Sequence, residues 1–459
     1  MVAKNKKVKS NKKVIVPTTE EIVSLINANK DKLDKARHMW SLYTYERDDL
    51  KIFGDSFDKE VPDYVKGTQQ KLHNSFYLEI VDTKVDYLLG NGITYNINDE
   101  NKEEIMEQLN RMDKINSTFD LEWEAATYSS ACGYVGRLIY ISEDETLEMK
   151  DRIKMINIPP WETIVNYNSN GDIVNAIRFY EAQNKVFVER YTEDETEFYE
   201  GDSLEDIKSV ETKSNLLTGI PFFKITNNKE EKSDTERVVD HVDQYDKVYS
   251  NLMSELKGFR DAIFTLSGGV TISAETLEFM KKNGVLVLPS TSSSENKVEA
   301  KWLIKELPVQ NFEVADDSIR RSINQFSQHV DFSEEAFAGD LTNFNITFKL
   351  MPLDIKASKY ETKLTKALDY QFKIIFAFWN LTLSTDIYDY FDLKYQFIRK
   401  KPRNKLEDAD EQVRLDGLVS NDTRLSLHPD IDDPTAEMRK MKDEEEGQFK
   451  KEMDVLDEN

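Results

Sequence analysis

The sequence has a single cysteine, Cys132, among its 459 residues, and only five histidines. One cysteine excludes a disulfide within the chain and fits a reducing compartment. The histidines are scattered, and their spacing matches no metal-ligand pattern. We therefore expect no metal site, and we expect Cys132, whose neighbours are small and apolar, to be a buried thiol rather than a nucleophile.

Long apolar runs are also missing. The longest, Ile374 to Trp379, has six residues, whereas a helix that spans a bilayer needs about 20. No apolar segment follows the six lysines near the N-terminus, so we expect neither a signal peptide nor a membrane anchor. Residues 1–17, which contain these lysines, are predicted to be a disordered basic arm.

The sequence contains no phosphate-binding loop of the form Gly-x-x-x-x-Gly-Lys-Ser/Thr. The stretch most similar to a nucleotide fingerprint is Gly90-Asn91-Gly92, between a predicted helix at 69–89 and a predicted strand at 93–96. A dinucleotide site needs the opposite order, strand first and helix last. We therefore interpret Gly90 as the left-handed stop of the helix, and we expect no cofactor and no enzymatic activity.

Negative charge is in excess, with 86 acidic and 61 basic residues and a net charge of −25. Such a surface repels nucleic acid over any broad face but does not exclude a local basic feature. Carboxylates are so frequent that no pair of them stands out as the acid and base of an active site. The 24 Phe and 20 Tyr residues supply large core side chains, so we expect several folded regions.

The residue pattern predicts a protein of mixed helices and strands. A helix is predicted at 18–48, and exposed acidic loops at 193–211. Short β-prone runs separated by turns lie between about 134 and 226; they are Tyr134–Ile141, Ile173–Tyr180, Lys185–Tyr191 and Ile220–Ile225. A further strand is predicted at 388–399, and helices from 404 onward and from 435 to about 455.

The most regular pattern starts at Ser233-Asp234-Thr235-Glu236, which has the form of a capping box. A helix of about 30 residues is predicted after it, ending at Gly268-Gly269. Its apolar residues alternate at four and three positions, and they are Val238, Val242, Tyr245, Tyr249, Leu252, Leu256, Phe259, Ile263 and Leu266. A second helix, predicted at 313–337, carries Ile319, Ile323, Phe326 and Val330. A short helix at 274–282 and strands at 285–288 and 301–305 lie between them, which indicates a stalk bearing a small head.

A third long helix is predicted to begin with Pro352 and to end near 383, after a loop at 340–351. Its apolar face consists of Leu353, Ala357, Tyr360, Leu364, Ala367, Ile374 and Phe378, interrupted by Gln371. Beside this face lies a row of five lysines: Lys356, Lys359, Lys363, Lys366 and Lys373. The row is either a solvated face with local ion pairs or a stripe that contacts phosphates without reading base sequence.

Three helices of this length exceed typical globular helices. Their apolar faces are buried either by packing inside a monomer or against copies of the same chain in a closed ring, and we favour the ring. The candidate inter-helix or subunit contacts are Val242, Tyr245, Tyr249, Leu252, Leu256 and Phe259.

An ordered set of short segments, spread from about 70 to 445, carries a family resemblance. The set comprises Ile80-Val81-Asp82-Thr83-Lys84, Tyr87-Leu88-Leu89-Gly90, Ile93-Thr94-Tyr95, Gly219-Ile220-Pro221-Phe222-Phe223, Asn227-Asn228, Ser233-Asp234, Asp243, Tyr245-Asp246, Ser250, Phe259, Asp261-Ala262, Leu418-Val419-Ser420, Thr423, Asp432-Asp433-Pro434 and Glu437. With these residues the chain resembles the portal proteins of tailed double-stranded DNA bacteriophages, of the type found in siphophages of Gram-positive hosts.

The resemblance implies an α+β fold with long stem helices, a β-rich wing, a small α/β clip and a helical C-terminal crown. Carried over by segment, the wing is 18–232 with 384–402, the stem 233–268 and 308–338, the clip 269–307, the tunnel loop and long helix 339–383, and the crown with its acidic tail 403–459. The loop residues expected to face DNA are Asn343, Phe344, Asn345 and Lys349. Relatives often have a Ser-Gly pair after this loop, where this chain has Phe344-Asn345-Ile346-Thr347, so the resemblance does not fix the register of the loop.

The resemblance also implies a ring of about twelve identical subunits at one capsid vertex. Double-stranded DNA would enter and leave through it without sequence recognition, driven by a partner ATPase. The implied partners are the terminase large subunit, the head–tail adaptor or connector, and the major capsid and scaffolding proteins, with no membrane. The implied locations are the portal vertex of the virion and, during assembly, the host cytoplasm.

Two other classes remain open from the residues alone. One is an acidic, coiled structural or chaperone-like oligomer that encloses no DNA channel. The other is a metal-dependent nuclease that uses the acidic loops, although no ordered carboxylate motif supports it.

Overall fold

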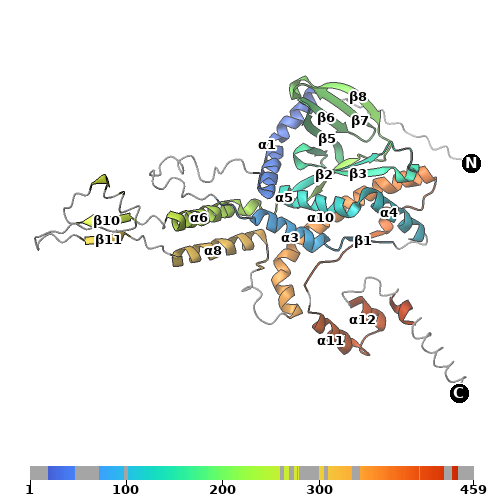
Figure 1. The fold of residues 1–459 in the computed structure, drawn as a ribbon. Helices are drawn as coiled ribbons and strands as arrows, with labels where there is room; N and C mark the ends of the chain where they lie inside the picture. The colour runs from blue at the N-terminus through green and yellow to red at the C-terminus, as the bar shows by residue number, and fades with distance from the viewer. Residues whose placement is uncertain are drawn as a thin grey trace, which may run out of the picture.

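The computed structural model describes residues 19–46, 72–97, 102–258, 263–267, 273–275, 278, 299–303, 309–332, 342–402, 404–427 and 437–442. Figure 1 shows a body of helices and sheets, from which a pair of helices projects to one side. Helices and strands are mixed along the chain, so the predicted α+β class is confirmed. The predicted basic arm, 1–17, lies outside the described residues.

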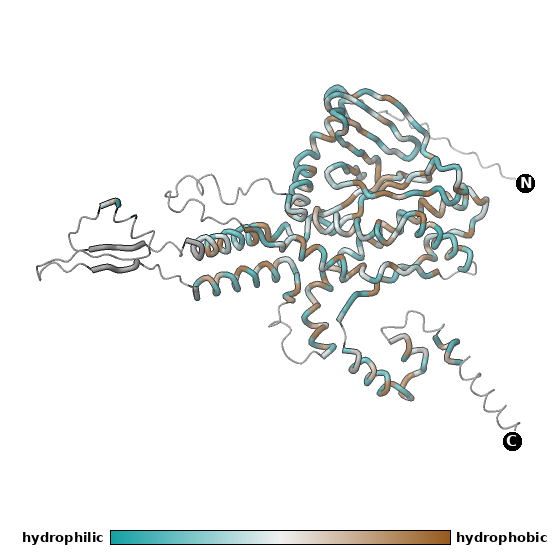
Figure 2. Tube along the Cα trace, viewed as in Figure 1, coloured by the Kyte–Doolittle hydropathy of each residue, from teal (hydrophilic) through white to brown (hydrophobic). Residues whose placement is uncertain are grey.

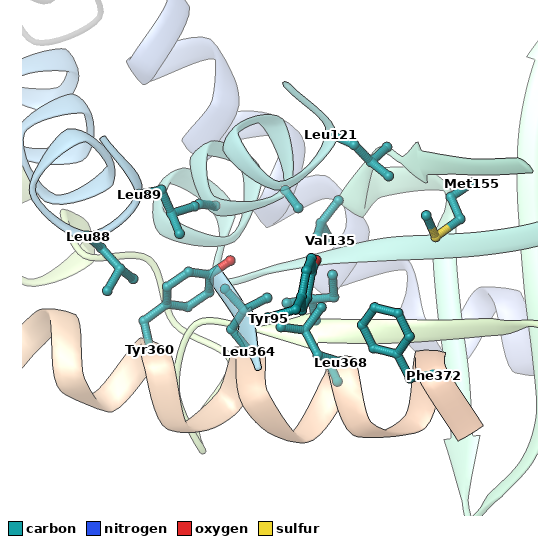
Figure 3. Close-up of a cluster of buried hydrophobic side chains, with 14 of the residues drawn as sticks. Leu88, Leu89, Tyr95, Leu121, Val135, Met155, Tyr360, Leu364, Leu368 and Phe372 are labelled. Carbon is teal, nitrogen blue, oxygen red and sulfur yellow. The ribbon is translucent and has the colours of Figure 1, made fainter. Parts of the chain in front are cut away.

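The centre of the body is built around α10, Asn343–Leu383, a helix of 41 residues. One face of α10 contacts α3 (Phe76–Leu89) and strand β9 (Phe222–Thr226). In Figure 3, Tyr360 and Leu364 of α10 lie beside Leu88 and Leu89 of α3, and all four side chains are buried. Complete burial of a side chain of this size contributes roughly 1.5–3 kcal/mol, so this face anchors α10 in the body.

A three-stranded antiparallel sheet lies against this core, in the order β3-β2-β9. Its central strand β2, Tyr134–Ile141, pairs with β3, Ile153–Ile158, on one side and with β9 on the other. Helix α5, Thr118–Cys132, comes directly before β2, and Gly133 turns the chain between them with a positive φ of 100°. The first six residues of β2 are buried, as expected for a central strand covered on both faces.

A five-stranded antiparallel sheet forms the outer part of the body, in the order β4-β5-β6-β7-β8. Its strands are Thr163–Tyr167, Ile173–Ala182, Lys185–Tyr191, Glu195–Gly201 and Lys208–Ser214. Helix α1, Thr19–Thr44, covers this sheet through Ile22, Ile26 and Leu33. Figure 2 shows that the outer strands are largely hydrophilic, whereas hydrophobic residues gather in the middle of the body.

The segment 193–211 is largely exposed, as predicted, but the prediction of loops is wrong, because β7 and most of β8 occupy it. Glu197 is buried in β7, where it accepts hydrogen bonds from Arg190 and from the Tyr199 hydroxyl. Every residue of β8 is exposed. Charged side chains are tolerated on such an edge strand, and they also discourage pairing with other chains.

A two-stranded sheet joins distant parts of the sequence. Strand β1, Ile93–Ile97, pairs with β12, Leu393–Phe397. Both strands were predicted, although β12 is shorter than the predicted 388–399. Helices α4 (Lys102–Asn116) and α5 and strands β3 and β4 were not predicted.

The projecting helices are α6, Val239–Gly258, and α8, Val309–Ser327, which we call the stalk. At the base of the stalk, Val242, Tyr245 and Ile323 form a cluster with Tyr77 and Ile80 of α3. Beyond the helices, strand β10 (Ile263–Ser267) pairs with β11 (Glu299–Leu303) in antiparallel fashion.

Both ends of the first predicted stalk helix are wrong. Ser233 is buried and does not cap a helix: its hydroxyl donates to the Ser130 carbonyl and accepts from the Thr235 amide. Helix α6 starts only at Val239 and ends at Gly258, and Ile263 and Leu266 belong to β10. The run Ile263-Phe264-Thr265-Leu266 has β-branched and aromatic residues, so strand pairing overrides its helical spacing. Gly268-Gly269 lies outside the described residues.

The second stalk helix also ends earlier than predicted. Helix α8 runs only to Ser327, and Gln328 has a positive φ of 54°, which ends it. Val330 is buried but lies beyond the helix, and Phe326 is half exposed, so the predicted face of this helix holds only for Ile319 and Ile323. In the head, the strand predicted at 301–305 corresponds to β11, whereas the one at 285–288 lies outside the described residues.

The predicted loop at 340–351 is wrong, because α10 begins at Asn343 and Pro352 lies inside it. The Thr342 hydroxyl caps the helix by accepting from the Asn345 amide at 3.3 Å. Proline removes the bond that its amide would give to the Phe348 carbonyl. Phe348 and Pro352 are both exposed, so water can satisfy that carbonyl.

Two smaller predictions about α3 are also corrected. Helix α3 begins at Phe76 instead of residue 69. Gly90 is right-handed, with φ −59°, and the positive φ of 77° belongs to Gly92. A Cβ atom on Gly90 would lie 2.4 Å from the Asp86 carbonyl oxygen and 2.7 Å from Cδ of Lys400, so close packing explains this glycine.

The C-terminal part contains α11, Lys405–Leu415, and α12, Asn421–Leu427, followed by a helical segment at 437–442. This agrees with the helical character predicted from 404 onward.

Candidate functional site

The four residues predicted to face DNA lie in the first two turns of α10. Asn343 is held by the start of α11: its amide donates to the Glu407 carboxylate at 2.7 Å and its Nδ2 to Asp408 at 2.8 Å. Its Oδ1 accepts from the Asn404 amide at 2.8 Å. We call these contacts the Asn343 clasp. They occupy the polar atoms of Asn343, so its side chain joins two parts of the chain.

The other predicted tunnel residues are more accessible. Phe344 and Asn345 are exposed, and Lys349 is half-buried. Phe344 belongs to a row of apolar side chains at intervals of four, three and four, which we call the α10 apolar stripe; its exposed fractions are 77% for Phe344, 68% for Phe348, 55% for Met351 and 43% for Ile355. Contiguous exposed apolar residues on a folded protein mark an interaction surface.

The predicted lysine row is not continuous. Lys356 is buried and donates from Nζ to the Ser327 carbonyl at 3.1 Å, so it is not available to a phosphate at the surface. Lys359 is exposed on the outer side of α10. Lys363, Lys366 and Lys373 line one cavity of about 710 Å³ between α10 and the sheets. A stripe of five surface lysines is therefore not present.

Lys356 belongs to a buried charged network where the stalk, α3 and α10 meet. Lys84 of α3 donates to Asp234 at 2.8 Å and also to the Asn227 side chain, and its Nζ lies 4.6 Å from the centre of the Tyr360 ring. Asn227 in turn donates to Asp234 at 2.9 Å. The network ties Lys84 to residues more than 100 positions away, and through Lys356 and Ser327 it reaches the end of α8.

Burial and charge act in opposite directions in this network. Burial disfavours ionisation of Asp234, but the charges of Lys84 and Lys356 outweigh it, and the pKa of Asp234 lies below its ordinary value. Burial lowers the pKa of Lys356 to about 8, against the raising effect of Asp234. Burial also lowers the pKa of Lys84. The Asp234 carboxylate thus favours the charged form of both buried lysines, Lys84 and Lys356.

The predicted apolar face of the first stalk helix is partly internal. Val242 and Tyr245 are buried between α6, α8 and α3, which makes them contacts within one subunit. Tyr249 stacks on Tyr245 with ring centres 6.0 Å apart, and Leu252 is half-buried. The side chains of Leu256 and Phe259 lie outside the part of the chain whose side chains are described.

Polar residues of α6 hold the segment that leads into α3. Asp246 is buried and accepts from the Asn74 amide at 3.1 Å and from Asn74 Nδ2 at 2.8 Å. It also lies 2.9 Å from His73 Nδ1. Ser250 accepts from the Leu72 amide at 2.9 Å. In the sequence, Asp246 and Ser250 were noted only as residues of the family resemblance. The apolar periodicity of this helix did not predict that these two polar residues are buried.

The described part of the chain also bears on the expectations for metal ligands, membrane spans and the single cysteine. Within it, no three His, Cys, Asp or Glu side chains gather as metal ligands. No described helix combines the length and apolarity that a bilayer crossing requires. Cys132 is buried, and its burial raises the pKa of the thiol well above the usual range, as predicted for a packing residue.

The described part of the chain thus combines a layered body, a projecting two-helix stalk and an exposed apolar stripe of the kind that marks an interaction surface. Residues 6–451 match the family described as phage portal protein, SPP1 Gp6-like. This match covers nearly the whole sequence, and the chain belongs to that family.

Two curated relatives have the same name. A portal protein of Clostridium phage phiCD119 is 23% identical over 440 residues, which cover 90% of this chain and 93% of the relative. A portal protein of Bacillus phage SPP1 is 23% identical over 465 residues, covering 95% and 88%. The predicted family, from phages of Gram-positive hosts, is confirmed, as is the function of a phage portal protein in DNA packaging.

The comparisons give no support to the alternative of an oligomer without a channel. Portal proteins form oligomeric rings that interact with the capsid and the terminase, and they are structural components of the virion.

Proposed function

We propose that this chain forms a closed ring of about twelve subunits at one capsid vertex and that double-stranded DNA passes through its centre during packaging and ejection. The observation that carries the proposal is the family match over residues 6–451. Phe348, Met351 and Ile355 of the α10 apolar stripe support it, since a closed ring offers these exposed apolar side chains a place on a neighbouring subunit.

Within the ring, residues 18–232 with 384–402 are the wing, and α6 with α8 is the stem. We assign β10 and β11 to the clip, because they pair with each other beyond the stalk helices. This moves the start of the clip from residue 269 toward Gly258, where α6 ends. Residues 403–459 are the crown with its acidic tail.

The first turns of α10 are the proposed tunnel-facing segment, with Phe344, Asn345 and Lys349 nearest to DNA. They lie on the same end of the helix as the Asn343 clasp. The acidic character of the chain keeps phosphates from adhering, and salt confines each field to about 8 Å at physiological ionic strength. Contacts of this kind involve no base edges, so passage is independent of sequence.

The partners follow from the same proposal. The clip meets the terminase large subunit during packaging and the head–tail adaptor afterwards, while the wing meets the major capsid and scaffolding proteins. Assembly takes place in the host cytoplasm. The terminase supplies the free energy for DNA movement, so the chain acts without catalysis or cofactor.

Electron microscopy of the purified protein, combined with native mass spectrometry, tests the proposal. We expect a closed ring of a single mass with a central channel wide enough for a duplex. A stable dimer or a solid particle contradicts the proposal.

A matched pair of variants tests the tunnel assignment. Lys349→Glu in the tunnel-facing segment and Lys394→Glu in β12 carry the same charge change. We expect normal rings from both, and a loss of packaged DNA only for Lys349→Glu. Equal packaging by the two variants contradicts the assignment while leaving the ring intact.

A further inference from the structure

The cavity beside α10 has an unusual charge for this protein. Its basic side chains come from α10 and from the segment around β9, and they are Lys224, Lys229, Lys363, Lys366 and Lys373. Three carboxylates line it as well: Asp172, Glu193 and Glu231. The lining is therefore net positive in a chain of net charge −25.

Most of these lysines have no carboxylate partner. Glu231 is shared by Lys224, at 3.3 Å, and Lys32. In the part of the chain that the structure describes, Lys229, Lys363, Lys366 and Lys373 form no ion pair. The charges of these lysines are therefore not neutralised within the described chain, and they are available to a negatively charged group of another molecule.

The floor of the cavity is apolar. Ile220, Phe223, Ala367 and Ile374 are buried side chains of its lining. Tyr370 of α10 crosses the floor and donates to the Ile220 carbonyl at 3.1 Å. The lysines at 363, 366 and 373 are three and seven positions apart on α10, which places them on the same side of the helix as Tyr370.

The walls are held by local hydrogen bonds. In the turn between β4 and β5, the Asn168 side chain accepts from the amides of Asn170 and Asp172, both at 2.9 Å. On the other side, Asn215 donates to the Gly219 carbonyl at 2.8 Å, and Gly219 has a positive φ of 100°. The walls of the cavity are therefore held in place without a bound molecule, and binding does not have to pay for ordering them.

We propose that this cavity binds an acidic peptide segment of an assembly partner, with its carboxylates at the lysines and an apolar side chain on the floor. The apolar floor favours this occupant over DNA, because a duplex presents phosphates and sugars but no apolar side chain. The recess lies between a helix and a hairpin turn, which suits a single extended chain. The Lys224 side chain is largely buried and already paired with Glu231, so the lysines of α10 and Lys229 are the ones that meet the peptide.

Fluorescence anisotropy with defined probes tests the proposal. The probe is a labelled peptide with five aspartates and glutamates around one leucine; the comparison peptides replace the acids by amides or the leucine by serine. We expect the full-length protein to bind the acidic peptide, the serine peptide several-fold more weakly, and the amide peptide not at all.

A charge-matched pair of triple variants locates the binding. The first is Lys363→Glu, Lys366→Glu and Lys373→Glu; the control is Lys208→Glu, Lys359→Glu and Lys394→Glu, at exposed positions that do not line this cavity. We expect a loss of about tenfold or more in affinity for the cavity variant and less than about twofold for the control. Circular dichroism and ring formation, equal in both, show that each variant folds.

Three results overturn the proposal: no binding of the acidic peptide by the unmodified protein, equal losses in the two variants, or equal binding of the serine and leucine peptides. A duplex DNA probe that competes with the peptide and loses affinity in the cavity variant alone assigns the lysines to phosphates instead. None of these results bears on the ring itself, because ring formation is measured separately.

Discussion

The two ends of α10 have the same apolar periodicity but different surroundings. From Ile346 to Phe378, one apolar face of α10 is buried against α3, β9 and the three-stranded sheet. Only the first part of the helix, from Phe344 to Ile355, carries a second apolar row with the same spacing, and this row is exposed. We call the part with the exposed row the exposed half and the remainder the buried half. The comparison teaches that apolar residues at intervals of four and three predict a helix face that is buried against something. The three-dimensional structure decides whether the same chain or another molecule buries it.

The buried half of α10 also contains a polar interruption, Gln371, which accepts from Arg137 at 2.8 Å. Arg137 is buried and forms a bidentate pair with Glu122, with distances of 2.9 and 3.1 Å. Removing one partner leaves the other charge buried and unpaired. We expect Arg137→Met to lower the free energy of unfolding by about 3–5 kcal/mol, measured by chemical denaturation.

The double variant Arg137→Met with Glu122→Leu controls for this effect, because it removes both charges. We expect it to be more stable than the single variant. If both variants are destabilised equally, the loss comes from packing and not from the unpaired carboxylate.

Paired truncations compare the two halves directly. Leu364→Ala, in the buried half, is expected to lower the free energy of unfolding of the subunit by about 2–5 kcal/mol, because it leaves a cavity. Met351→Ala, in the exposed half, is expected to change it by less than about 0.5 kcal/mol. Thermal and chemical denaturation of the dissociated subunit measure both, and similar losses would contradict the contrast between the halves.

The pH dependence of stability tests the network at the boundary between the halves. The pKa of Lys356 is about 8 in the folded chain and about 10.4 in an unfolded one. Between these values the unfolded chain binds more protons, so stability rises with pH, and Lys356 costs stability below pH 8. We expect the free energy of unfolding of Lys356→Met, relative to that of the unmodified chain, to be highest near pH 7. This relative stability should fall by roughly 1–3 kcal/mol by pH 10.

Denaturation at pH 7, 8.5 and 10 measures this difference. The comparison between the two proteins removes the contribution of the tyrosines, which titrate in both. A difference that does not change with pH would mean that Lys356 keeps its ordinary pKa.

The smallest effect on the subunit is expected from charging the α10 apolar stripe. Phe348→Asp with Met351→Asp should leave the free energy of unfolding of the subunit within about 0.5 kcal/mol, since both side chains are exposed. If the stripe is covered by a neighbouring subunit, the fraction of protein in rings falls several-fold, as measured by mass photometry. Undiminished rings would show that the stripe serves another contact.

The sequence predicted those elements whose local pattern was unambiguous. The bounds of β2 and β6 were correct because turn residues flank alternating or buried β-prone runs. The start of α10 was missed because Phe344-Asn345-Ile346-Thr347-Phe348 has strand-like composition and Pro352 resembles a first helical residue. Tertiary packing overrode both preferences.

The candidate site was less predictable than the fold, because its contacts join distant parts of the chain. Lys356 belonged to a basic row in the sequence, yet its partners Ser327 and Asp234 come from other elements. The cavity likewise needs the β4–β5 turn and α10 together. Only the family resemblance, which reflects the whole fold, identified the function.

The Asn343 clasp also has a consequence for how this chain can change over time. One side chain satisfies groups at 404 and 408, more than 60 positions away. A substitution of Asn343 leaves the Asn404 backbone amide and the Asp408 carboxylate without this partner. A substitution of Asp408 likewise leaves the side-chain amide of Asn343 without an acceptor. Positions 343 and 408, on α10 and α11, are therefore expected to change together among descendants of this sequence.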